Sequence, residues 1–323
     1  MKKTIGILLI ISILIIGCSN KTNTQKAEDK NKVETITITD NRGEQKIPKN
    51  AKSIAVLDSR AFAIIADWKV KISAAPKNLI PADNPLKNDE GIANIGNHKE
   101  PKFETLASVQ PDIVIIGQRF AQHYDAIKEL LPNTKLIDIN INLEEKDSKN
   151  LVDGLISHTE ILGKIFNKEK EANALINQLN ESIERLKAIN TKDKTFMGVI
   201  VSAKNIGYSA PHTGRVWGPI FDILNLKPAL EIKNASSNHK GDDISVEAIA
   251  KSNPDVLLVL DRDAAISKEE SVPAKDIIEG SNTLKNTNAI KNNKVYFAPN
   301  DTYINESIKT FINIFNQLED FLK

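Results

Sequence analysis

The sequence predicts an α/β protein in which two α/β lobes are joined by one long bridging helix. Two observations carry this prediction: a sixteen-residue phrase that occurs twice, and a long amphipathic segment between its two copies. The copies run from Glu104 to Arg119 and from Glu247 to Arg262, with Glu, Ala, Pro, Asp and Arg at matching offsets 143 residues apart. A spacing of that length excludes a solenoid and indicates two similar lobes.

Each copy of the phrase predicts a short helix, a turn and a buried strand. The helix ends before a Pro-Asp pair, because the residue before proline disfavours helical backbone. The β-branched apolar run that follows is typical of a strand buried on both faces of a parallel sheet. Arg119 and Arg262 come just past these strands, where open α/β sheets bind their ligands. We therefore expect the two arginines to face one cleft.

The other segments alternate between strand and helix patterns on both sides of the bridging helix. Strands are expected at 35–39, 53–57, 136–141, 196–202 and 295–297, and helices at 61–68, 124–131, 151–166, 219–226 and from about 305 onward. Residues 91–102 predict an irregular loop. Apolar residues at helical spacing predict the bridging helix at 168–189, with Asn167 as its cap. A helix of that length spans roughly 33 Å, enough to connect two lobes as a stiff strut.

The N-terminal residues predict export and lipid anchoring. Residues 1–17 combine two lysines with an apolar run of signal-peptide length, too short to cross a membrane. Cys18, the only cysteine, follows this run in a sequence that resembles a bacterial lipobox, so we expect it to be lipidated on the extracytoplasmic face of the cell membrane. Residues 18–33 are polar and predict a flexible tether. The N-terminal lobe is then expected at 34–166, the bridging helix at 167–190 and the C-terminal lobe at 191–323.

Composition excludes several classes of function. The 43 basic residues nearly balance the 42 acidic ones, and no basic tract is interleaved with aromatics, so nucleic-acid binding is not expected. A single cysteine excludes an internal disulfide. Only six of the basic residues are arginines, which makes a matched pair of them notable, since a guanidinium binds anions at two points and lysine does not.

Several phrases together resemble one family, the rigid two-lobed binding proteins of ABC importers. They are Asn94-Ile-Gly-Asn97, the two repeat copies, Gly214-Arg-Val-Trp-Gly218, Asn238-His-Lys-Gly241 and Thr302-Tyr303, in addition to the lipobox and the bridging helix. Within that group the chain is similar to the binding proteins for ferric catecholate siderophores of the petrobactin and enterobactin type. The resemblance covers the whole mature chain and implies the helical-backbone form of the periplasmic-binding-protein fold.

The resemblance also implies a ligand site. Arg119, Arg215 and Arg262 match the three arginines that surround the anionic chelate, and His239 and Tyr303 match residues that reach Fe(III) where the siderophore leaves positions open. Fe(III) is hard and suits phenolate oxygen, and imidazole also binds iron. The iron complex is cargo, so no intrinsic cofactor is expected. The protein is expected to be a monomer that performs no chemistry.

Two glutamates are implied to contact the permease. Glu104 and Glu247 open the two repeat copies, and in this family a glutamate on each lobe meets arginines of the permease. Three other residues stay open: His212 is a rival ligand, His98 is near the expected cleft, and a core position is favoured for Trp217.

The sequence leaves other cargoes and an enzyme as weaker alternatives. Haem favours one axial Tyr or His in an apolar slot and cobalamin favours little positive charge, whereas a Zn or Mn receptor needs several His and carboxylates together. An exported esterase is disfavoured because the sequence has no Gly-x-Ser-x-Gly elbow and no His-Glu-x-x-His motif.

Overall fold

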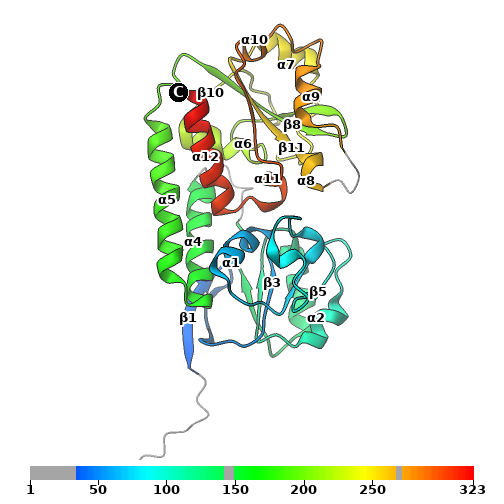
Figure 1. Cartoon of the computed structure of the whole chain (residues 1–323), viewed down its shortest axis with the longest axis vertical. Helices are drawn as coiled ribbons and strands as arrows, with labels where there is room; N and C mark the ends of the chain where they lie inside the picture. The colour runs from blue at the N-terminus through cyan, green and yellow to red at the C-terminus, as the bar shows by residue number, and fades with distance from the viewer. Residues whose placement is uncertain (1–33, 142–148, 267–270) are drawn as a thin grey trace, which may run out of the picture. The chain divides into compact units, whose positions relative to one another are not determined.

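The computed structural model describes residues 34–141, 149–266 and 271–323 (Figure 1). Residues 34–323 form one compact unit. The predicted signal peptide, Cys18 and the tether lie outside the described residues. Within the described ranges, no helix combines the length and the apolar character needed to cross a membrane.

The first half of the unit contains a hairpin and a parallel sheet. Antiparallel β1 (Thr35–Asp40) and β2 (Gly43–Pro48) form the hairpin. The five-stranded sheet has the order β5-β4-β3-β6-β7, and its strands are β3 (Ile54–Leu57), β4 (Ala74–Ala75), β5 (Ala93–Asn94), β6 (Ile113–Ile116) and β7 (Lys135–Asp138). Its helices are α1 (Phe62–Trp68), α2 (Phe103–Val109) and α3 (Tyr124–Leu130).

The second half is built around another sheet. It has the order β10-β8-β11-β12, with β9 antiparallel to β8, and its strands are β8 (Thr195–Ser202), β9 (Asn205–Ser209), β10 (Lys227–Pro228), β11 (Val256–Asp261) and β12 (Val295–Phe297). Its short helices are α6 (Trp217–Leu224), α7 (Val246–Ser252), α8 (Arg262–Ile266), α9 (Ala274–Glu279), α10 (Asn288–Lys291) and α11 (Thr302–Asn305). The alternation of strands and helices confirms the predicted α/β class.

The sequence repeat is also a structural repeat. One copy forms α2 and β6, and the other forms α7 and β11. In each copy the carboxylate of the Pro-Asp pair accepts hydrogen bonds at the start of the neighbouring strand. Asp112 accepts from the Lys52 and Ser53 amides at 2.8 and 3.0 Å, and Asp255 accepts from the amide and hydroxyl of Thr195, both at 2.9 Å. The repeated aspartate therefore ties each repeat strand to its neighbour.

Three long helices pack together alongside the sheets: α4 (Lys149–Phe166), α5 (Glu169–Lys187) and α12 (Ile308–Leu322) (Figure 1). Helix α5 contacts α4, α6 and α12, so it touches elements from both halves. One continuous apolar core includes Ile54 of β3, Leu179 of α5, Phe311 of α12 and Ile200 of β8. This shared core favours a rigid connection between the halves. The domain limits expected at 166, 190 and 191 stay predictions.

Three local expectations were wrong. Asn167 does not cap α5: it adopts a left-handed φ of 54°, which reverses the chain after α4, and Lys168 is the N-cap residue. The segment 91–102 contains β5, a strand of two residues that is too short to show an alternating pattern. The last helix begins at Ile308 rather than near 305, because Ser307 caps it by accepting a hydrogen bond from the Thr310 amide.

Candidate functional site

All five side chains predicted for the ligand site line one cavity of about 1170 Å³: Arg119, Arg215, His239, Arg262 and Tyr303. The wall from the first half also includes residues 78–83 and 97–100, and the wall from the second half includes residues 264–266, 300, 301 and 304. The cavity therefore lies where the two halves face each other, and its size suits a small-molecule ligand.

The Tyr303 ring is the common contact of the three arginines. The guanidinium carbons of Arg215, Arg262 and Arg119 lie 4.3, 5.3 and 5.7 Å from its ring centroid, within the range of cation–π attraction. The Tyr303 backbone carbonyl also accepts hydrogen bonds from Arg215 Nη2 at 3.1 Å and Arg119 Nη2 at 3.3 Å. Tyr303 thus contacts three guanidiniums that are distant from one another in the sequence.

Arg119 is positioned by a close fit after β6. A Cβ on Gly117 would lie 2.2 Å from the buried Asp58 Oδ2, so glycine is required for this approach. Gln118 then adopts a positive φ of 46°, and its amide donates to Asn140 Oδ1 at 2.9 Å. This turn directs the chain from the end of the strand into the cavity wall, as the sequence position of Arg119 predicted.

Arg215 precedes a strained turn at the start of α6. Val216 has φ 63° and ψ −56°, and the Trp217 amide donates to the Arg215 carbonyl oxygen at 2.7 Å. These values describe a γ-turn with positive φ, the rarer and more strained form, at a β-branched residue. Such strain concentrates at functional positions, and here it fixes the backbone of Arg215.

Two residues position the Arg262 guanidinium: Ser202, the last residue of β8, and the adjacent Asp263. Its Nη1 donates to Ser202 Oγ at 3.1 Å and lies 3.7 Å from Asp263 Oδ1. Arg262 is the first residue of α8, so it follows β11 directly, whereas Arg119 is separated from β6 by two residues. The matched sequence positions thus bring both arginines to the same cavity.

His239 lies on a loop that is attached to β9. Tyr208 and Asp242 exchange two backbone hydrogen bonds of 2.7 and 3.1 Å. A Cβ on Gly207 would lie 2.0 Å from the Lys240 carbonyl oxygen, so the loop packs directly on the strand. Partial burial lowers the pKa of His239, and the nearby Arg262 guanidinium lowers it further. The imidazole is therefore favoured in its neutral form, which is the form that binds metal ions.

The cavity lining carries a net positive charge, because Arg119, Arg215 and Arg262 together with Lys87 and Lys99 outnumber Asp83, Glu100 and Asp301. Burial lowers the pKa of Arg119, and the Arg215 guanidinium adds to that shift. The pKa of His98, which also lines the cavity, is lowered by burial and then by Arg119. Because these positive groups raise the electrostatic potential in the cavity, an anion would be attracted to it. Within the described ranges, no three His, Cys, Asp or Glu side chains come together as a metal site.

The sequence left the roles of His98, His212 and Trp217 open, and the structure places the three residues in different environments. His98 lines the cavity. His212 forms an ion pair with Asp222 and is not among the described residues that line the cavity. Trp217 is fully buried and belongs to the core. Glu104 and Glu247 are both exposed and are the second residues of α2 and α7. Their equivalent placement is a fact of the fold, and their contact with a permease stays a prediction.

Sequence reasoning missed a buried ion-pair cluster behind the arginines. The carboxylate of Glu306 lies 3.3 Å from Arg60 Nη2 and 2.6 Å from Arg215 Nε, and it accepts a hydrogen bond from Gln118 Nε2 at 3.1 Å. The scarcity of arginine was the one signal that pointed to Arg60. Nothing in the local sequence marks Glu306, because its partners are distant along the chain.

A further buried pair supports this cluster. Asp58 Oδ2 lies 3.0 Å from His158 Nε2, and the Arg60 amide donates to Asp58 Oδ1 at 2.9 Å. Burial raises the pKa of Asp58, but its contacts with His158 and Arg60 outweigh that effect and lower the pKa. This pair fixes the start of the segment that carries Arg60 and blocks any side chain at Gly117.

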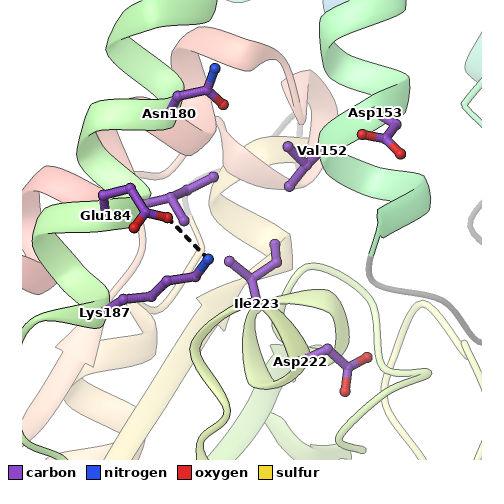
Figure 2. Close-up of a pocket in the computed structure, with 8 residues that line it drawn as sticks. Val152, Asp153, Asn180, Glu184, Lys187, Asp222 and Ile223 are labelled. Atoms are coloured by element: carbon purple, nitrogen blue, oxygen red, sulfur yellow. Dashed lines mark hydrogen bonds and ion pairs between the residues drawn. The ribbon is translucent and has the colours of Figure 1, made fainter.

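A second cavity, of about 430 Å³, lies between α4, α5 and α6 (Figure 2). Its polar lining includes Glu184 and Lys187, which form an exposed ion pair at 3.1 Å. None of the predicted site residues lines it. A solvated pair of opposite charges on one helix is an ordinary surface feature, so this cavity is a weaker candidate than the arginine-lined one.

Comparison with known proteins gives a consistent result. The model of the periplasmic binding protein family matches residues 54–302. The petrobactin-binding protein YclQ of Bacillus subtilis (strain 168) is 29% identical over 303 residues, covering 92% of this chain and 90% of YclQ. The ferric-anguibactin-binding protein FatB of Vibrio anguillarum is 27% identical over 291 residues, covering 89% of this chain and 87% of FatB.

The crystal structure of YclQ aligns with a TM-score of 0.75 at 25% identity, covering 90% of this chain and 99% of that one. The matched family consists of substrate-binding proteins of transporters and not of enzymes. The family model covers well over half of the sequence, and the chain therefore belongs to the periplasmic binding protein family.

Proposed function

We propose that this protein captures a ferric catecholate siderophore in the arginine-lined cavity and delivers it to the permease of an ABC importer for iron uptake. The observation that carries the proposal is the convergence of Arg119, Arg215 and Arg262 on the Tyr303 ring. Two relatives are named as a petrobactin-binding protein and a ferric-anguibactin-binding protein, and these names support a siderophore as the cargo.

The charge of the cargo matches the charge of the wall. A ferric tris-catecholate carries three negative charges, and the three guanidiniums that line the cavity balance them. Guanidiniums also stack on aromatic rings, so they recognise catechol faces as well as catecholate oxygens. Haem would meet charged groups where it needs an apolar slot, which leaves haem and cobalamin as the weaker alternatives.

His239 and Tyr303 are proposed as supplementary ligands to iron. Both line the cavity, and the neutral imidazole and the phenolate oxygen are ligands that iron accepts. They would act where a siderophore with fewer catechols leaves coordination positions open. Iron arrives and leaves with the siderophore, so it is cargo and not a cofactor.

The remaining proposals concern the cell surface. Cys18 is proposed as the lipidated residue that anchors a monomeric protein to the outer face of the membrane, and the named lipoproteins among the relatives support this. Glu104 and Glu247 are proposed to contact two equivalent sites on the permease, since they open two equivalent repeats.

The proposal is tested by tryptophan-fluorescence quenching of the chain without residues 1–18. Trp217 lies two residues after Arg215, so a coloured iron complex in the cavity is expected to quench it. Tight quenching by a ferric catecholate, and not by ferric hydroxamate, haem or cobalamin, is the expected result. Tight binding of haem or cobalamin alone would keep the fold and overturn the cargo.

A further inference from the structure

Glu306 is a buried carboxylate that lies directly behind the cavity wall. Its side chain is 6% exposed and does not belong to the described lining of the cavity. It follows α11 and adopts a left-handed φ of 41°, which turns the chain before α12 begins. A glutamate in this conformation at a buried site is uncommon, so its contacts need a functional explanation.

The carboxylate reaches two of the cavity arginines by different routes. Arg215 Nε lies 2.6 Å from Oε1, an ion pair in which the N–H does not point along the contact. Gln118 connects the second arginine: its amide nitrogen donates to Glu306 Oε2 at 3.1 Å, and its amide oxygen accepts from Arg119 Nη1 at 3.2 Å. Glu306 thus holds Arg215 directly and Arg119 through one amide.

Arg60 compensates the charge of Glu306. Its Nη2 lies 3.3 Å from Glu306 Oε2, and its Nε donates to the Glu306 carbonyl oxygen at 3.3 Å. The Arg60 side chain is 3% exposed and, like Glu306, is absent from the described lining. Because the charges of Arg60 and Glu306 offset each other, Glu306 does not reduce the positive charge that the three guanidiniums present to the cavity.

Three guanidiniums around one ring repel each other, so they need a fixed negative group to stay converged while the cavity awaits cargo. Binding is tighter when such groups are ordered beforehand, because less freedom is lost on association. A carboxylate exposed to the cavity beside the three guanidiniums would offset their charge and repel an anionic cargo. A carboxylate behind the wall, neutralised by its own arginine, orders the guanidiniums without that penalty.

We propose that Glu306 is a positioning residue for the cavity arginines and that Arg60 is its charge-compensating partner. Glu306 fixes Arg215 and Arg119 in their converged positions, and Arg60 preserves the net positive charge that recognises a trianionic iron complex. This inference rests on the proposed function for its cargo, but the positioning of the arginines is measurable without any cargo.

The substitution Glu306→Gln separates positioning from simple charge. It raises the net charge behind the wall by one, so electrostatic attraction alone would tighten binding of a ferric tris-catecholate. Loss of positioning instead weakens binding, and we expect an affinity at least about tenfold lower by fluorescence titration of the full chain in detergent. Equal or tighter binding would overturn the inference.

A second readout needs no ligand. The chain has six arginines, so the Nε–H groups give a small set of nuclear magnetic resonance signals that single substitutions assign. We expect water exchange of the Arg215 Nε–H in the free protein to become at least about tenfold faster in Glu306→Gln, because the guanidinium loses its fixed partner. Unchanged exchange would overturn the inference, and this holds even if the wild-type protein binds no ferric catecholate. A failure of the wild-type protein to bind any ferric catecholate would overturn only the proposed function.

Two further variants keep the test decisive. Arg60→Gln retains Glu306 and is expected to leave Arg215 exchange within about twofold. Cargo binding is expected to weaken about threefold or more, since the charge of Glu306 behind the wall is then no longer compensated by Arg60. If Glu306→Gln does not fold, Glu306→Asp is used, because the shorter side chain keeps the charge but does not span Arg60 and Arg215. The same weakening and faster exchange are expected from it.

The matched control is Lys309→Gln. Lys309 forms an ion pair with Asp67 near the start of α12, so it connects the two halves close to Glu306 without touching the arginines. Binding within about twofold of wild type is expected. A loss as large as that of Glu306→Gln would assign the effect to looser packing of the halves and would overturn the positioning role.

Discussion

Tyr303 contacts Arg215 in two ways: its ring centroid lies 4.3 Å from the guanidinium carbon, and its carbonyl oxygen accepts a hydrogen bond from Nη2 at 3.1 Å. The ring supplies a face for the cation, and the backbone fixes the direction of the guanidinium fork. The residue proposed to reach iron is therefore also one that arranges the positive wall.

Replacing Arg262 by lysine keeps the charge but removes the two-point geometry of the guanidinium. We expect the affinity for a ferric catecholate to fall about tenfold, and about 10- to 100-fold for Arg262→Ala, because a charge-assisted hydrogen bond contributes about 1.5–3 kcal/mol. Isothermal titration calorimetry measures both. Arg185→Lys, at a surface ion pair with Glu319, is the control and should bind normally. A fully active Arg262→Lys protein would contradict the role given to Arg262.

The substitution Tyr303→Phe keeps the ring under the arginines and removes the phenol. With a siderophore that leaves coordination positions open, we expect the phenolate-to-iron absorption band to disappear, while affinity for a ferric tris-catecholate changes less than about threefold. Visible absorption spectra of the two complexes test this. An identical band in both proteins would show that Tyr303 does not bind the iron.

Acid is expected to destabilise the protein through Glu306. Burial by itself raises the pKa of the Glu306 carboxyl, but the nearby guanidiniums, Arg215 and Arg60 foremost, hold that pKa below its ordinary value of 4.5. A carboxyl with a lowered pKa in the folded state contributes stability that is present above about pH 4.5 and is lost as the pH falls through the folded pKa. Urea unfolding between pH 6 and about pH 3 should show a smaller loss for Glu306→Gln than for wild type. Parallel pH profiles would contradict this.

The substitution Gly117→Ala should be costly although it adds only a methyl group. The new Cβ would lie 2.2 Å from Asp58 Oδ2, and Asp58 cannot withdraw because His158 holds it at 3.0 Å. We expect a loss of about 2–3 kcal/mol in the free energy of unfolding. Gly91→Ala, where the nearest atom belongs to Asp89 at 3.1 Å in an exposed segment, should cost less than about 0.5 kcal/mol. Equal effects would contradict the packing argument.

The paired glutamates are expected to act only after cargo is bound. Glu104→Ala combined with Glu247→Ala should leave ferric catecholate affinity within about twofold but lower iron uptake by cells about tenfold or more. Glu279→Ala, at another exposed carboxylate, should leave uptake normal. Normal uptake with the double variant would contradict the docking role.

The sequence was sufficient to predict the fold class and the convergence of Arg119 and Arg262. This worked because a repeat with the same Pro-Asp turn and the same buried strand places its last residue at the same end of each sheet. Arg215, His239 and Tyr303 have no such local pattern, and the family resemblance was needed to find them. Their placement around one cavity agrees with that resemblance, and their roles stay predictions.

The sequence was not sufficient to predict the cluster behind the wall. Glu306 lies 91 positions from Arg215 and 246 positions from Arg60, and a glutamate before a helix ordinarily predicts an exposed residue. Its burial depends on how α11 packs against the segment after β3, which is a tertiary contact. The same holds for Asp58 and His158, which are 100 residues apart.

The central claim is tested most directly by locating iron in crystals grown with a ferric catecholate, using the anomalous scattering of the metal. The account predicts one strong peak inside the cavity, among Arg119, Arg215 and Arg262 and facing Tyr303. An iron peak in the second cavity, between α4, α5 and α6, would contradict the account. A catecholate complex bound away from the three arginines would also contradict it.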